Sequence, residues 1–275
     1  MRRIIVDKVS KEEKVIARQK SRLSKKEKKL LQKEDNKFVQ LKINPLKNQA
    51  EEKIPQKVRS GINKAFEKGF YFIFEKGTSI IEKSYNYKRL KDDADTNEYK
   101  LSKEISSRNL RAIDRDVNIG SIISQGITAV EGTALGFLGV GMPDIPIFIG
   151  VILRTIYEIS LKYGFEYDND KEKVFILNVI CTGIGNKEER RKYSAECDKL
   201  SHAIDNNDDI YVNLDVMIKE TSEKLVESLL VSKFIQGIPF VGAIGGAANY
   251  MVLSSISRVA KLKYKKRLIN KLQTK

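Results

Sequence analysis

One segment of the chain, residues 234–257, carries no charged side chain, although charged residues make up 32% of the sequence. A transmembrane helix needs about 20 apolar residues, so this segment is long enough to cross a bilayer. It is also rich in glycine and alanine, and Pro239 and Asn249 interrupt it. Because small residues let helix backbones approach closely, this composition favours packing against other helices over contact with lipid. We therefore interpret the segment as a central helix of a bundle, with membrane insertion as the alternative.

A second apolar segment, residues 121–157, has the same character. Its Gly132 and Gly136 are four residues apart, so they would share one face of a helix and allow close packing. Asp144 is suited to cap a new apolar helix, and Gly164 is a natural stop for it. Two glycine-rich apolar segments of this kind predict an all-α, multi-helix bundle in which both lie at the centre.

Helical spacing of apolar residues elsewhere supports this fold class. Ser10 and Glu13 form a capping box, which predicts that a first helix begins at Ser10. The polar stretch Arg89–Lys103 is predicted to turn the chain. Further helices are predicted after Pro55 and over residues 102–130, 171–182, 188–203 and 214–230, and a basic helix ends the chain. No stretch shows the sustained alternation of a strand.

The positive charge is concentrated at the two ends. Residues 1–48 hold 16 Lys and Arg against 6 Asp and Glu, and residues 258–275 hold 8 Lys and Arg and no acid. Basic ends suit an anionic membrane surface or nucleic acid. For the N-terminal arm, a simply solvated surface is an equally good interpretation. The absence of tryptophan and of interleaved aromatic and basic residues disfavours nucleic acid. The predicted membrane-surface cluster is Lys261, Lys263, Lys265, Lys266 and Arg267.

No motif in the sequence indicates a cofactor, a metal or a catalytic centre. There is no phosphate-binding loop and no dinucleotide fingerprint, and the acidic loops lack the glycine and glutamate of a calcium site. A catalytic triad would depend on His202 alone, and Cys181 and Cys197 match no metal spacing. The first residues lack the apolar run of a secretory signal, which favours the cytoplasm.

Two isolated carboxylates are the exception. Glu131 and Asp144 are the only ionisable residues between Ser121 and Leu153. A buried acid with a raised pKa could perform proton chemistry. The structural interpretation, in which Asp144 caps a helix and Glu131 meets a cation such as Arg154, is favoured.

At these positions the chain resembles the EcsC family. The resemblance covers about residues 50–270. It includes the glycine-rich stretch before Asp144, the Tyr163-Gly164-Phe-Glu sequence and the segment from Ile238 to Asn249. The positions that carry it include Glu131, Gly132, Gly136, Asp144, Tyr163, Gly164, Gly242 and Asn249. The resemblance implies a bacterial protein whose family has no established reaction. The family is named for a component encoded beside an ABC transporter, which implies a membrane-linked auxiliary role.

Together these features predict a basic, helical or partly disordered arm over residues 1–48 and an EcsC-like helical domain over residues 49–275. The predicted function is that of a non-enzymatic protein at the inner face of the cell membrane, auxiliary to a transporter or secretion system. Its expected partner is the anionic membrane surface or a membrane protein. One alternative is an integral membrane protein with segments 121–157 and 234–257 inserted. Another is a hydrolase or lipid-modifying enzyme that uses Glu131 or Asp144.

Overall fold

The protein is an all-α helical bundle, as the sequence predicts. The structure, a computed structural model, describes residues 2–32, 56–118, 144–235 and 247–274; for residues 2–10, 118, 144, 230–235 and 247–249 it describes the backbone alone. The described part contains helices and connecting turns without a strand. The elements are α1 (Arg2–Leu31), α3 (Gln56–Phe72), the π-helical turn η2 (Ile73–Gly77), α4 (Thr78–Lys83), α5 (Tyr87–Lys103), α6 (Ser107–Asn118), α8 (Asp144–Lys162), α9 (Asp170–Ile184), α10 (Lys187–Asp205), α11 (Leu214–Ile235) and α12 (Ala247–Thr274).

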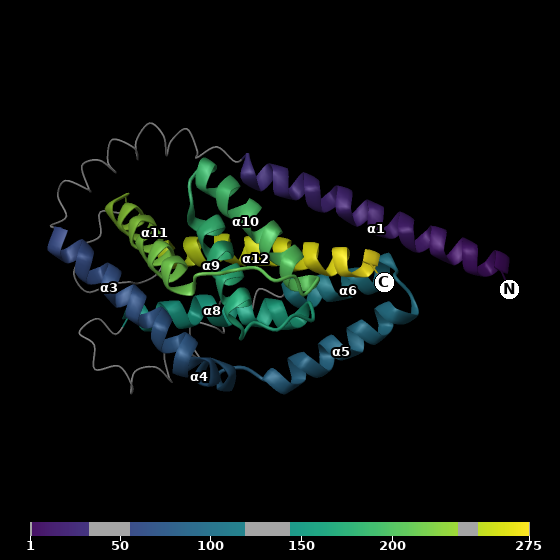
Figure 1. Ribbon diagram of the computed structural model, residues 1–275, viewed down its shortest axis with the longest axis horizontal. Coiled ribbons are helices and arrows are strands. Elements are labelled where there is room, and N and C mark those ends of the chain that lie inside the picture. The colour runs from purple at the N-terminus through teal and green to yellow at the C-terminus, as the bar shows by residue number, and fades with distance from the viewer. Residues whose placement is uncertain (1, 33–55, 119–143, 236–246, 275) are drawn as a thin grey trace.

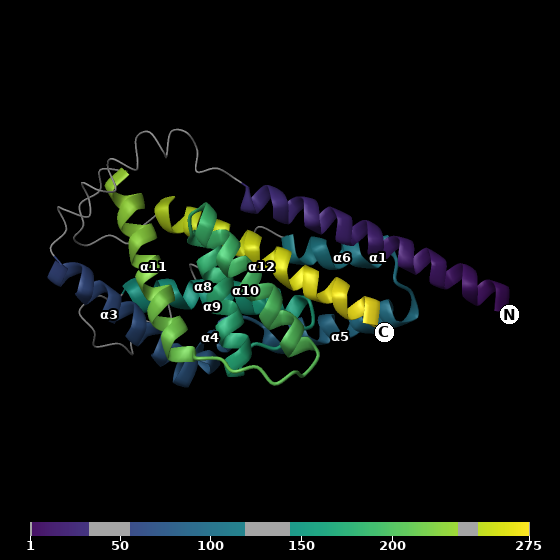
Figure 2. The ribbon, with the colours of Figure 1, turned by 45° about the horizontal axis from the view of Figure 1, so that its top comes forward.

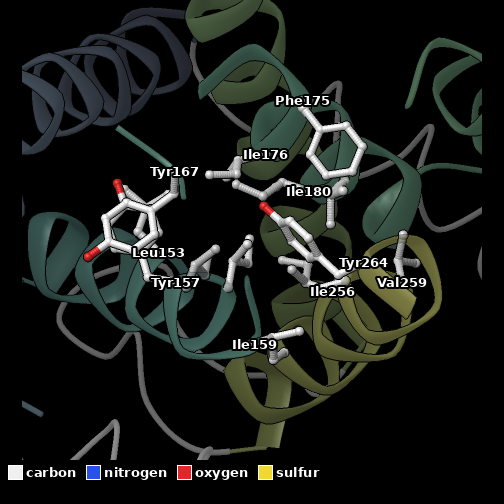
Figure 3. Close-up of a cluster of buried hydrophobic side chains, with 14 of the residues drawn as sticks. Leu153, Tyr157, Ile159, Tyr167, Phe175, Ile176, Ile180, Ile256, Val259 and Tyr264 are labelled. Atoms are coloured by element: carbon white, nitrogen blue, oxygen red, sulfur yellow. The ribbon is translucent and has the colours of Figure 1, made fainter. Parts of the chain in front are cut away.

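Helix α9 lies at the centre of the bundle. It packs against α10, α11 and α12, and every side chain from Val174 to Thr182 is buried. A helix that is apolar on all sides must be surrounded by other elements. Helices α8 and α12 complete the core, and Figure 3 shows side chains of all three helices gathered there, among them Tyr157, Ile180 and Tyr264. The ring of Tyr157 stacks on that of Tyr167 with 3.9 Å between centroids.

The two central helices α8 and α12 each follow one of the glycine-rich stretches singled out in the sequence. The stretches themselves, residues 119–143 and 236–246, lie outside the described residues, as do Glu131, Gly132, Gly136 and Gly242. The predicted end of α8 is confirmed, because the helix ends at Lys162 and Gly164, two residues later, adopts a positive φ of 81°. An L-residue pays a steric penalty in that conformation, and glycine does not.

Helix α1 lies along the outside of the bundle, where it packs on α12 and α10. Its N-terminal turns extend past the end of α12 in both views (Figures 1 and 2). The prediction that the first helix begins at Ser10 is wrong, since α1 begins at Arg2. The capping box at Ser10 and Glu13 therefore lies inside a continuous helix. The proposed boundary near residue 48 lies outside the described residues and stays a prediction.

The prediction of a turn over Arg89–Lys103 is also wrong, because this stretch is helix α5. The side chain of Asn86 caps the helix by accepting the backbone N–H of Arg89 at 3.0 Å. A thin apolar stripe that includes the buried Ala94 and Leu101 faces the body, and α5 packs on α8. A long polar helix with so few buried residues gives a weak periodic signal in the sequence.

Helices α9 and α12 cross in close contact at Gly183. A Cβ atom placed on Gly183 would lie 2.8 Å from the Cα atom and 3.0 Å from the nitrogen of Ile256. The hydroxyl of Ser255 donates a hydrogen bond of 2.6 Å to the Gly183 carbonyl at the same crossing. Backbone cannot move aside as a flexible side chain can, so this crossing requires glycine.

We expect Gly183→Ala to destabilise the protein by about 1–3 kcal/mol, because the added methyl group forces α9 and α12 apart. Urea unfolding followed by circular dichroism measures this free energy. Gly61→Ala is the matched control, since Gly61 lies inside α3 with nothing within 4 Å of its added Cβ. That change should be neutral or stabilise the helix by up to about 1 kcal/mol. Equal stability of Gly183→Ala and the unchanged protein would contradict the close crossing.

Candidate functional site

The basic residues of α12 do not form the exposed cluster that the sequence analysis assigned to them. Lys263 and Arg267 are each 2% exposed, and Lys265 is 9% exposed. Lys261 and Lys266 are half-buried. Buried charges are tolerated when they are paired, and the carboxylates of other helices pair with Lys263, Lys265, Lys266 and Arg267. Burial and pairing of Lys263, Lys265 and Arg267 leave little of this cluster exposed, and its role in membrane binding stays a prediction.

Arg267 joins α12 to α9 and α10. Its guanidinium donates two parallel hydrogen bonds, of 2.8 and 2.7 Å, to the carboxylate of Glu172, and further bonds to Asp205. The guanidinium carbon lies 4.3 Å from the ring centroid of Phe165 and 4.9 Å from that of Phe175. Burial disfavours the charged guanidinium, but the hydrogen bonds to Glu172 and Asp205 outweigh this effect and raise the pKa of Arg267. Arginine suits this place because its planar fork both pairs with a carboxylate and stacks on rings.

Lys263 and Lys266 join α12 to α10 and to α1. Lys263 Nζ lies 2.6 Å from a carboxylate oxygen of Glu27 and 2.7 Å from one of Asp198. Lys266 contacts the second oxygen of each carboxylate at 2.8 Å. Lys263 also donates to the backbone carbonyl of Ser194 at 2.9 Å. Two cations and two anions thus form a neutral network, which we call the α1 clasp: Glu27, Asp198, Lys263 and Lys266.

The clasp affects the ionisation of Glu27. Burial tends to raise the pKa of this carboxyl, but the charges and hydrogen bonds of Lys263 and Lys266 prevail and hold it below its ordinary value of 4.5. A carboxyl whose pKa is lower in the folded state stabilises the fold above its unfolded pKa. This stabilisation is lost as the pH falls below about 4.5 towards the lower folded value.

Tyr163, one of the positions that carry the family resemblance, belongs to a third contact. Lys265 Nζ lies 2.5 Å from Asp114 of α6, and the other oxygen of that carboxylate accepts the Tyr163 hydroxyl at 3.2 Å. Burial and the nearby Asp114 charge raise the pKa of Tyr163 well above its ordinary value, so it remains a neutral donor. This chain of contacts connects α12, α6 and the residue that follows α8.

A pocket of about 480 Å³ opens beside this contact, between α1 and α12. We call it the basic pocket. Six of its lining residues are cations and one, Asp114, is an anion. Its remaining residues are apolar or carry hydroxyl groups. The lining consists of Leu23, Lys26, Lys29, Leu30, Asp114, Tyr163, Thr182, Arg190, Ser255, Arg258, Val259, Lys261, Leu262 and Lys265.

The cations of the basic pocket differ in their surroundings. Lys26, Lys29 and Arg258 are exposed at its rim. Lys261 is half-buried, and burial together with the positive charge of Lys162 lowers its pKa. A lysine whose charged form is disfavoured in this way gains from an added anion. The arrangement therefore offers both a charged rim and a deeper cation for a negatively charged ligand.

A separate surface of exposed cations lies on the outward side of α1. We call it the outer face and define it as Lys11, Lys14, Arg18, Arg22, Lys25 and Lys28, all of which are exposed. No ion pair among the described residues involves them. Two acidic residues of α1 point inward instead: Glu12 accepts the backbone N–H of Ile105 at 3.0 Å, and Glu27 belongs to the α1 clasp. The helix is thus sorted into an outward basic side and an inward side that holds two acids.

Sequence reasoning identified the basic arm of residues 1–48 but not the sorting of its charges between two sides of α1, and it missed the basic pocket. A usable signal was present, because Glu12 and Glu27 follow the same helical spacing as the buried Ile16 and Leu23. The pocket combines residues from α1, α6, α9, α10 and α12, and no sequence pattern brings these together. Asp144 and Asn249 lie in the first turns of α8 and α12, where the backbone alone is described.

The described residues also bear on metals and membrane spans. Within them, no group of three His, Cys, Asp or Glu side chains is placed to hold a metal ion. Cys181 and Cys197 are buried free thiols, and burial raises the pKa of each to about 12. None of the helices in the described ranges combines the length and hydrophobicity that crossing a bilayer requires.

We expect Glu27→Gln to loosen α1, because the change leaves Lys263 and Lys266 with Asp198 as their remaining carboxylate partner. The loss of one partner of a largely buried network should cost up to about 3 kcal/mol. Hydrogen exchange measured by mass spectrometry should show faster exchange in α1, and the variant should lose the stability change near pH 4.5. Glu13→Gln, at an exposed position of the same helix, should alter neither. Unchanged exchange in Glu27→Gln would show that the clasp does not hold α1.

Comparison with known proteins places the chain in a family. The EcsC protein family matches residues 17–269. Protein EcsC of Bacillus subtilis (strain 168) is 24% identical over 220 residues, which cover 78% of this chain and 81% of that protein. The uncharacterized protein YdbA of the same strain is 30% identical over 146 residues, or 51% of this chain and 52% of its own length. No solved structure shows a significant match. Because the family match extends over most of its length, the chain belongs to the EcsC protein family.

Proposed function

We propose that this protein is a non-enzymatic, peripheral membrane-binding protein of the cytoplasmic face. The observation that carries the proposal is the outer face of α1, where six exposed cations lie along one side of a helix. An anionic lipid surface attracts such residues by about 1 kcal/mol for each Lys or Arg close to it. Several of them acting together supply enough free energy for reversible binding.

The inward acids of α1 support this orientation. Glu12 and Glu27 are both engaged by the body of the protein, so they do not cancel the positive potential on the outward side. The α1 clasp also couples the helix to α10 and α12. A force applied to α1 at a membrane would therefore be transmitted to the rest of the bundle. We assign the role to α1 because Lys263, Lys265 and Arg267 of α12 are buried and paired with carboxylates.

The proposal is tested by sedimentation with phosphatidylcholine vesicles that contain phosphatidylglycerol. We expect the unchanged protein to bind these vesicles and to be released by salt, because ions screen exposed charges. Replacing Lys14, Arg18, Lys25 and Lys28 with Gln should weaken binding by at least about 100-fold, given the contribution of each cation.

The matched control removes the same charge from the opposite part of the molecule. Lys57, Lys64 and Lys68 of α3 and Lys88 of α5 are exposed, so their replacement with Gln lowers the net charge equally. The proposal requires the control to bind nearly as well as the unchanged protein. Equal loss in both variants would mean that total charge, and not the outer face, drives binding. If the α1 variant binds the vesicles as well as the unchanged protein, the outer face would be only a solvated surface without a role in binding.

Alkaline carbonate extraction separates the proposal from the integral alternative. A protein held by surface charge should leave the membrane in carbonate, whereas inserted segments would retain it. The insertion of segments 121–157 and 234–257, the link to a transporter or secretion system and a reaction at Glu131 or Asp144 stay predictions. Retention after the wash would contradict peripheral binding.

A further inference from the structure

The basic pocket offers two kinds of surface to one ligand. Three of its cations are exposed, whereas its apolar residues Leu23, Val259 and Leu262 are buried, so we call these three residues the floor. Its volume of about 480 Å³ falls in the range of small-molecule sites, roughly 300–1,000 Å³. We infer that the pocket binds a phosphate-bearing amphiphile, with the phosphate among the cations and the hydrocarbon part on the floor.

The charge of the lining selects an anion with more than one negative charge. Lys26, Lys29 and Arg258 bring three exposed cations from two different helices to one opening. Like charges placed together repel one another, so the arrangement gains when an anion enters. A phosphate monoester carries up to two charges and three acceptor oxygens, and arginine and lysine are its usual partners. The carboxylate of Asp114 is already engaged by Lys265 and Tyr163, so it does not block an anion at the rim.

The floor selects an amphiphile over a wholly polar phosphate. Leu23, Val259 and Leu262 form it, with the half-buried Leu30 at its edge. Contact with these side chains removes the hydrocarbon chain of the ligand from water, which is favourable in proportion to the area covered. A headgroup with no hydrocarbon would leave this part of the pocket wet.

The position of the pocket indicates the source of the ligand. Lys26 and Lys29 belong to α1, the helix that carries the outer face, so the pocket opens beside the surface proposed to meet the membrane. A lipid is therefore the ligand to which we commit. This choice of source rests on the proposed function, whereas the chemistry of the pocket does not.

The test uses isothermal titration calorimetry with water-soluble probes below their micelle concentrations. Dihexanoyl phosphatidic acid should bind the full chain. Glycerol 3-phosphate, which lacks hydrocarbon, and dihexanoyl phosphatidylcholine, which lacks net charge, should each bind at least 10-fold more weakly. Equal binding of glycerol 3-phosphate would overturn the role of the floor and indicate a soluble phosphate ligand. Equal binding of the phosphatidylcholine would overturn the role of the cations.

Variants connect the binding to the pocket. Lys29→Gln with Arg258→Gln changes two exposed residues and should weaken phosphatidic acid binding at least 10-fold. Lys14→Gln with Arg18→Gln is the charge-matched control on the outer face and should leave it unchanged. Leu30→Ser should weaken binding of the amphiphile but not of glycerol 3-phosphate. If the pocket variant binds as well as the unchanged protein, the site lies elsewhere and the inference is wrong.

The same variants separate failure of this inference from failure of the proposed function. Loss of vesicle binding in the outer-face variant, with no binding of monomeric phosphatidic acid in any form of the protein, would refute the pocket ligand alone. If the protein binds monomeric phosphatidic acid but does not bind vesicles, membrane docking alone would be refuted. Displacement of the phosphatidic acid by a short RNA would show instead that the cations serve nucleic acid.

Discussion

The fold depends on how the positive charges of α12 are neutralised. Arg267 is almost completely enclosed, yet it is paired with Glu172 of α9 and Asp205 of α10. Removing water from a charge costs several kcal/mol, and a well-formed network recovers that cost only in one arrangement of the helices. Each buried cation of α12 therefore fixes the position of a neighbour: Arg267 fixes α9 and α10, Lys263 fixes α10 and α1, and Lys265 fixes α6. Charge pairing sets the relative placement of these helices, while apolar burial supplies most of the driving force.

Much of the helical architecture could be predicted from local signals. Gly164 ends α8 where the sequence placed the stop, and α9, α10 and α11 cover the predicted ranges. Such signals work because caps and glycine stops depend on a few neighbouring residues. The prediction failed at α5, whose polar sequence hides a narrow buried stripe that includes Ala94 and Leu101.

The pairing of the α12 cations could not be predicted from the sequence, for a different reason. Five basic residues within 261–267 predict an exposed basic surface when this segment is considered alone. Their carboxylate partners lie 62 to 239 residues away in the chain. Those partners, Glu27 and Asp205 among them, carry no local sign that they will meet α12. By contrast, the helical period predicts that the side chains of Glu12 and Glu27 on α1 point inward. This spacing could have shown that the outward side of α1 is basic.

Helix α1 takes part in three features at once, so the free energy of each depends on the position of the same helix. Its inward side closes the α1 clasp, its flank lines the basic pocket, and its outward side forms the outer face. A ligand that needs Lys26 and Lys29 in place binds well only while α1 is docked, so it must stabilise docking in proportion to its saturation. The apparent affinity for such a ligand falls with the fraction of molecules in which α1 is docked, so a change that undocks α1 weakens binding of the ligand. Protonation of Glu27 would therefore reduce the occupancy of a pocket whose lining does not contain it. A membrane that holds the outer face would favour whichever position of α1 leaves those six cations nearest to lipid.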